Sequence, residues 1–284
     1  MNNTLERITC GVLSDKEKDE IKNAVNTNFF HSRLNVFKST NGIRKGEFSV
    51  IVGPAGNGKS ALCKTISTEC AVGGKKCYHL LSEEKSSTYK NNIFKTFESI
   101  TSGKSKKYLE LLFFESMIDW DDSMLNYNYF FDHLQDVINE LCPDMVIFDN
   151  FTTSFMGSLP ISVQANMITK FRKIASVFDI ALIGVFHTAK GTDIYKKVIN
   201  GEDVRGNAST TNAGSYNYIL STYFRCTPPR AILYVDKARY HTESHKAYYE
   251  MYFDKESGIF TKDSKIEYSA VKQLIDLANK PTKH

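Results

Sequence analysis

The sequence predicts an α/β protein with a largely parallel central sheet, helices on both faces, and antiparallel strands near the C-terminus. Two observations predict this fold class. From residue 48 to residue 186, short apolar runs alternate with longer helix-forming segments, which is typical of strands joined by crossover helices in a buried parallel sheet. After residue 215, strand-like runs follow one another with turns and no helices between them, which favours antiparallel pairing.

The elements are expected in a fixed order along the chain. Residues 1–35 are polar and helix-prone and show no strand signal. Strands are then expected at 48–52, 76–81, around 108–114, 144–149 and 180–186, with helices at about 59–72, 84–101, 126–142 and 161–177. Hydrophobic periodicity is lost over 188–212. The later strands are expected at 216–224, 230–236 and 246–253.

Composition places the chain among ordinary globular proteins. Of its 284 residues, 42% are hydrophobic and 24% are charged, which argues against a disordered chain or a coiled coil. The net charge of +4 permits an anionic partner without requiring one. The six cysteines lack the spacing of a zinc site, so reduced core thiols are expected. Because there is no apolar run of about 18 residues and no secretory leader, we expect a cytoplasmic protein without membrane contact.

The most specific motif is GPAGNGKS at residues 53–60, which fits the pattern G-x-x-x-x-G-K-[ST] between an expected strand and an expected helix. In such a loop the backbone N–H groups and the helix N-terminus hold the α- and β-phosphates of a nucleotide. Lys59 is expected to reach the β- and γ-phosphates, and the Ser60 hydroxyl to hold Mg²⁺. The sequence therefore predicts an ATP and Mg²⁺ site. Its predicted nucleotide contacts are Gly53, Pro54, Ala55, Gly56, Asn57, Gly58, Lys59, Ser60 and Ala61.

Acidic residues end two of the expected strands, at the sheet edge where α/β proteins bind ligands. Asp149 follows four apolar residues and is predicted to be the second Mg²⁺ ligand. Glu83 and Glu84 follow the strand at 76–81, and hydrolysis requires a carboxylate to orient or deprotonate the attacking water. We predict Glu83 as the catalytic base and Glu84 as the substitute. A glutamate here also suits the first turn of a helix, so the two residues can serve different purposes.

His187 ends the strand at 180–186, where it could sense the γ-phosphate or could be a structural residue with satisfied hydrogen bonds. The segment 188–212 that follows is longer than an ordinary connection between two elements. It combines cations, hydroxyls and glycines that suit contacts with the backbone of single-stranded DNA. The residues predicted to bind DNA are Lys190, Lys196, Lys197, Arg205 and Asn207. The loop at 152–164 has no basic residue and is the weaker candidate.

Taken in order, several segments over residues 36–262 resemble the RecA-like P-loop ATPases, most closely the core of hexameric replicative DNA helicases of the DnaB-like and phage primase–helicase group. The segments are NGIRKGEFSVIVGPAGNGKS, LLSEE, MVIFDNF, GVFHTAKG with GEDVRGNAST, and LYVDKARYH. The resemblance implies a ring, most simply a hexamer, or a filament, with ATP bound between subunits. It also implies that Lys237 and Arg239 contact the γ-phosphate on the neighbouring subunit. A guanidinium forks onto phosphate oxygens and stabilises the charge of the transition state.

This resemblance gives three expected parts, namely a helical linker or oligomerisation segment at 1–35, a RecA-like ATPase domain at 36–262 and a helical tail at 263–284. The chain departs from the family pattern at Asn207, where a serine is usual, and no primase domain is expected in the 35 residues before the ATPase domain. A primase or loader is then expected as a separate polypeptide, and so compact a chain suggests a phage or mobile-element source.

Two other functions remain open from the sequence. One is a RecA-like recombination or annealing ATPase that forms filaments on DNA. The other is a KaiC-like regulatory ATPase, whose paired glutamates resemble Glu83 and Glu84 and which need not bind DNA.

Overall fold

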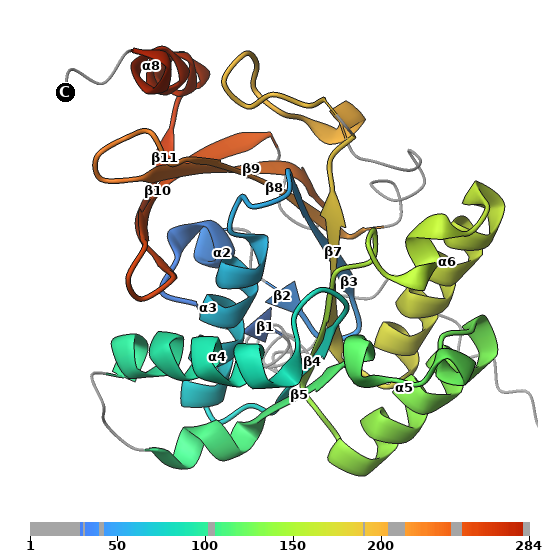
Figure 1. The fold of residues 1–284 in the computed structure, drawn as a ribbon. Coiled ribbons are helices and arrows are strands. Elements are labelled where there is room, and N and C mark those ends of the chain that lie inside the picture. Colours follow the sequence, from blue (N-terminus) through green and yellow to red (C-terminus); the bar gives the residue numbers. More distant parts are fainter. Residues whose placement is uncertain are drawn as a thin grey trace, which may run out of the picture.

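A computed structural model describes residues 29–30, 32–39, 43–101, 106–189, 191–203, 214–239 and 246–280 (Figure 1). A large mixed sheet lies at its centre, in the strand order β11-β10-β9-β8-β3-β7-β6-β4-β5. The strands are β3 (Phe48–Gly53), β4 (Cys77–Leu81), β5 (Leu112–Ser116), β6 (Met145–Asp149), β7 (Ala181–His187), β8 (Tyr216–Tyr223), β9 (Arg230–Ala238), β10 (Ala247–Asp254) and β11 (Ile259–Ile266).

The sheet has a parallel half and an antiparallel half. Strands β8, β3, β7, β6, β4 and β5 pair in parallel, and β8, β9, β10 and β11 pair antiparallel. In the parallel half, every residue of β3, β4 and β6 is buried, as expected for strands covered on both faces. The predicted α/β fold class, with antiparallel strands at the C-terminal side, is confirmed.

Helices cover both faces of the parallel half. Figure 1 shows α3 (Lys59–Val72) and α4 (Ser86–Thr101) on one face, with α5 (Tyr127–Leu141) and α6 (Ile161–Val177) on the other. On the α5 and α6 face, Phe130, Phe131, Phe148 and Phe171 form one aromatic cluster. Burial of such a side chain contributes about 1.5–3 kcal/mol. The two packed layers hold the strand ends in fixed positions relative to one another.

Some elements differ from expectation. The strand expected around 108–114 begins only at Leu112, because residues Lys106–Leu111 form a 3-10 helix before it. Strand β11 was not predicted, and its pairing with β10 makes it the edge of the sheet. The predicted boundary at 262/263 falls inside this strand. Helix α8 (Tyr268–Asn279) follows it and packs on the α5 and α6 side of the core.

The N-terminal region also departs from expectation. A short strand β1 (Phe29–Phe30) pairs with β2 (Ile43–Arg44), although no strand was expected before residue 35. Helix α2 (Asn35–Ser39) begins at a buried carboxylate of β11, since the backbone N–H groups of Asn35 and Val36 donate to Asp263 at 2.6 Å. Residues 1–28 lie outside the described residues, so the oligomerisation segment stays a prediction. Among the helices of the described residues, none is long and apolar enough to cross a membrane.

Candidate active site

The predicted phosphate-binding loop joins β3 to α3 in a shape that requires glycine. A Cβ on Gly53 would lie 2.5 Å from the carbonyl oxygen of Leu220. Gly58 has a φ of 82°, a backbone conformation that residues other than glycine rarely adopt. The loop is fixed to β8 through Asn57. Its Oδ1 accepts from the backbone N–H of Thr222 at 2.5 Å, and its carbonyl oxygen accepts from the Thr222 hydroxyl at 2.7 Å. The first-turn N–H groups of α3 are therefore held in place for an anion.

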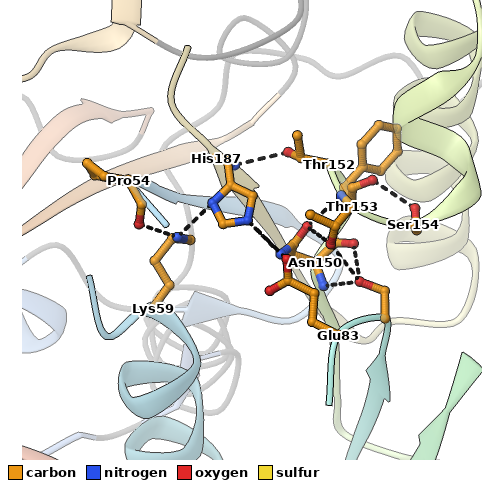
Figure 2. Close-up of polar contacts among 10 residues, drawn as sticks. Pro54, Lys59, Glu83, Asn150, Thr152, Thr153, Ser154 and His187 are labelled. Carbon is orange, nitrogen blue, oxygen red and sulfur yellow. Dashed lines mark hydrogen bonds and ion pairs between the residues drawn. The ribbon is translucent and has the colours of Figure 1, made fainter. Parts of the chain in front are cut away.

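Lys59 is buried at the start of α3, with only 5% of its surface exposed. Its Nζ donates to the carbonyl oxygen of Pro54 at 2.7 Å and lies 3.1 Å from Nδ1 of His187 (Figure 2). Burial lowers the pKa of Lys59 to about 8, although the nearby carboxylates of Asp149 and Glu83 act in the opposite direction. The site therefore holds a cation that is short of negative charge, and a triphosphate would supply it.

This burial predicts a stability effect. We expect Lys59→Met to raise the free energy of unfolding of nucleotide-free protein at pH 7 by about 1–3 kcal/mol, because one pKa unit corresponds to about 1.4 kcal/mol. In the wild type, stability should rise with pH between about 8, the pKa of folded Lys59, and about 10.5, where the unfolded lysine also loses its proton. The variant should lack that rise.

Urea unfolding of both proteins at pH 7 and pH 10 measures the difference. The matched control is Lys64→Met, which should lower stability because Lys64 pairs with Glu84 at 2.7 Å. A Lys59→Met protein that is less stable than wild type by the same amount at both pH values would contradict the account.

His187 links Lys59 to Glu83. Because the Lys59 ammonium can only donate, Nδ1 of His187 accepts from it. The other ring nitrogen, Nε2, lies 3.3 Å from Oε1 of Glu83. Hydrogen bonds from His187 foremost, and from Thr153 and Asn150, lower the pKa of Glu83 to about 2. Glu83 is therefore ionised at neutral pH. Its side chain is 47% exposed and open to water.

Glu84 has a different environment from its neighbour. Its Oε2 accepts from Nζ of Lys64 at 2.7 Å, and its Oε1 accepts from Nδ2 of Asn92 at 2.5 Å. Both carboxylate oxygens are thus bound to side chains of α3 and α4. The structure places Glu83, and not Glu84, in contact with the network around Lys59.

Ser60 and Asp149 are brought together as the sequence predicts. Asp149 is buried at the end of β6. Burial raises the pKa of its carboxyl group, while a hydrogen bond from Ser60 and the charge of Lys59 act in the opposite direction. Hydroxyl and carboxylate oxygens are the ligands that Mg²⁺ prefers, and a cation would relieve the buried charge of Asp149. The two residues therefore fit a Mg²⁺ site.

The segment directly after Asp149 contributes contacts that the sequence analysis missed. Asn150 Nδ2 lies 3.0 Å from Nε2 of His187, and its Oδ1 accepts from the backbone and hydroxyl of Thr153 (Figure 2). The Thr152 hydroxyl accepts from the backbone N–H of His187 at 3.0 Å. The run of polar residues after the apolar strand was the available signal.

The predicted DNA-binding residues are only partly visible. Lys190, Arg205 and Asn207 lie outside the described residues. Lys196 is exposed and lies 3.7 Å from a carboxylate oxygen of Asp193. Lys197 forms an ion pair with the carboxylate of Asp203. Each of the two described lysines therefore has an aspartate beside it.

Lys237 and Arg239 lie toward the end of the sheet at which β3 begins. The phosphate-binding loop follows the other end of β3. Strand β9 runs antiparallel to β8 and ends beside its first residue. The backbone N–H of Arg239 donates to Ser215, whose own N–H donates to Phe48, the first residue of β3. The loop begins at the other end of β3, about 16 Å away at the usual rise per residue. Arg239 therefore cannot reach the phosphate site of its own chain, and Lys237 lies at the level of Val50, three residues before Gly53.

The family model described as an AAA domain matches residues 31–193, more than half of the chain. The matched region contains the phosphate-binding loop, Glu83, Asp149 and His187, and it ends before Lys237 and Arg239. No curated protein matches the chain.

Proposed function

This chain belongs to the AAA domain family of P-loop ATPases, and from that premise we propose that it is a DNA helicase-type motor of replication. It would hydrolyse ATP at subunit interfaces, translocate on single-stranded DNA and unwind the duplex. The observation that carries the proposal is the separation of the two sets of predicted catalytic residues, which lie toward opposite ends of the parallel strands. A head-to-tail ring, most simply a hexamer, brings the edge with Lys237 and Arg239 of one subunit against the phosphate-binding loop of the next.

The geometry suits phosphoryl transfer to water. The loop and Lys59 bind the phosphates, and Ser60 and Asp149 hold Mg²⁺, which neutralises charge on the phosphate oxygens when bound. With a pKa near 2, Glu83 is a weak base, so its main contribution is to orient the attacking water. A loose transition state needs little proton removal before it forms. Arg239 of the next subunit would then stabilise the charge on the transferred group.

His187 is suited to report the nucleotide state. In the structure Lys59 is bonded to His187, and His187 to Glu83. A γ-phosphate competes with His187 for the Lys59 ammonium, so its arrival and loss change the hydrogen bonds of His187 and Glu83. The next residues lead into the loop at 188–212, where Ala189 donates its N–H to the carbonyl oxygen of Asp203 at 2.7 Å. This connection supports coupling of hydrolysis to movement of the proposed DNA loop.

One observation favours a second candidate. Because Lys196 and Lys197 each lie beside an aspartate, their charges are partly neutralised, which suits a regulatory ATPase that does not bind DNA. The DNA contact of the motor would then depend chiefly on Lys190, Arg205 and Asn207.

The test is strand separation on a forked duplex, with wild type, Mg²⁺ and either ATP or a non-hydrolysable analogue. We expect ATP-dependent release of the displaced strand and none with the analogue. Strand annealing or exchange without displacement would instead indicate the recombination ATPase. Absence of all three activities, with ATP still hydrolysed, would contradict a DNA motor.

A further inference from the structure

A second charged pocket lies away from the phosphate-binding loop. It has a volume of about 370 Å³ and lies between α6, the start of β3 and the end of β9. Its polar lining consists of Glu47, Thr169, Arg172, Lys173, Ser176 and Arg239. Of these, Glu47 and Arg239 belong to segments that the sequence analysis recognised, and the four residues of α6 do not.

Helix α6 presents this lining because of its amphipathic pattern. Positions 169, 172, 173 and 176 are spaced at i, i+3, i+4 and i+7, so they share one face of the helix. All four are exposed, while Ile168, Phe171 and Ile174 on the other face are buried in the core. The hydrophobic contacts of α6 therefore fix Arg172 and Lys173 beside the end of β9.

The pocket gathers more positive than negative charge, with three cations and one carboxylate in its lining. Within the described part of the chain, Arg172, Lys173 and Arg239 form no ion pair. Burial is the main cause that lowers the pKa of Lys237. The charges of the nearby Arg239 and Arg172 lower it further, whereas the adjacent Asp236 acts in the opposite direction. The one carboxylate in the lining, Glu47, accepts a hydrogen bond from the Ser215 hydroxyl. Like charges held together cost free energy until an anion binds between them.

We propose that this pocket binds the polyphosphate of the nucleotide held by a neighbouring subunit, with Arg172 as a third phosphate-binding cation beside Lys237 and Arg239. The inference rests on the proposed function, because the pocket lies at the edge of the sheet that cannot reach its own loop. Arg172 can fork onto two phosphate oxygens, and Lys173 at the rim adds charge. The hydroxyls of Thr169 and Ser176 complete a polar lining that suits an oxyanion.

The experiment compares ATP turnover of Arg172→Ala, Arg172→Lys and the control Lys90→Ala, an exposed lysine of α4. We expect Arg172→Ala to lower turnover at saturating ATP by about 10- to 100-fold. Arg172→Lys should retain part of the activity, since lysine keeps the charge and loses the fork. Lys90→Ala should match wild type. Each variant is first shown to bind a fluorescent ATP analogue and to unfold at the same urea concentration as wild type.

Mixing then locates the defect. A mixture of Arg172→Ala with Lys59→Ala contains interfaces with an intact loop from the first protein and an intact pocket from the second, so turnover should partly return. Arg239→Ala is mixed with Lys59→Ala in parallel. If only the Arg239 mixture recovers, or if Arg172→Ala turns over ATP normally, the proposed role of Arg172 is wrong and the shared site stands. If neither mixture recovers, the shared site itself is wrong. Weakened DNA binding with normal DNA-free turnover would assign the pocket to nucleic acid and also overturn this inference.

Discussion

Replacing Glu83 by glutamine is expected to reduce ATP hydrolysis at saturating ATP by about 10²- to 10⁴-fold while ATP binding is retained. The carboxylate of Glu83 is ionised, partly exposed and joined through His187 to Lys59. Glutamine preserves the size of the side chain and removes the negative charge that orients the attacking water. Single-turnover hydrolysis and equilibrium binding of a fluorescent ATP analogue separate the two effects.

Glu84→Gln is the matched control, one residue away. Because both oxygens of Glu84 are bound to Lys64 and Asn92, the loss should appear as lower stability, by about 1–3 kcal/mol for a partly buried charged hydrogen bond. The folded Glu84→Gln protein should keep most of its turnover. The opposite result, with an active Glu83→Gln and an inactive Glu84→Gln, would assign the catalytic role to Glu84.

Replacing Arg239 by alanine is expected to lower turnover by about 10³-fold or more, the range found for arginine fingers. Arg239 lies beside the start of β3, whereas the phosphate-binding loop follows the end of β3. We therefore expect this loss to arise through the active site of another copy of the chain. A mixture with Lys59→Ala should therefore recover part of the activity, as argued above. Activity of wild type should also fall on dilution, as the assembly dissociates.

Arg230→Ala is the control on the same strand. Arg230 lies at the other end of β9 and pairs with Glu250 at 2.9 Å, so its removal should affect stability and not the recovery on mixing. An Arg239→Ala protein with wild-type turnover would remove the argument for a shared active site.

The loop and the strand ends could be predicted from the sequence because their signals are local. Gly53 lies against β8, Gly56 and Gly58 have positive φ angles, and Asp149 follows an unbroken apolar run. Glu83 and Glu84 could not be separated, since their environments depend on Lys64 and Asn92 from two other helices. Nothing in the sequence near His187 indicates Lys59 as its partner. That contact arises because β7 pairs with β3 and sets His187 opposite Gly53.

Other features depend on tertiary contacts from the start. Strand β11, with the sequence IFTKDSKI, buries only Ile259, Phe260 and Asp263, so it lacks the alternation that identifies a strand. Its pairing with β10 decides its conformation. In the same way, Arg172 looks like an ordinary surface residue of an amphipathic helix. Its position beside Arg239 becomes visible only once β9 is placed in the sheet.

The central claim is that ATP hydrolysis is coupled to single-stranded DNA. Its most direct test is the steady-state rate of ATP hydrolysis with and without single-stranded DNA, at low and at high salt. We expect DNA to raise turnover and high salt to reduce the increase, because contacts with the phosphate backbone release counterions. Turnover that is the same with and without DNA at both salt concentrations would contradict the motor and leave the regulatory ATPase as the function to test.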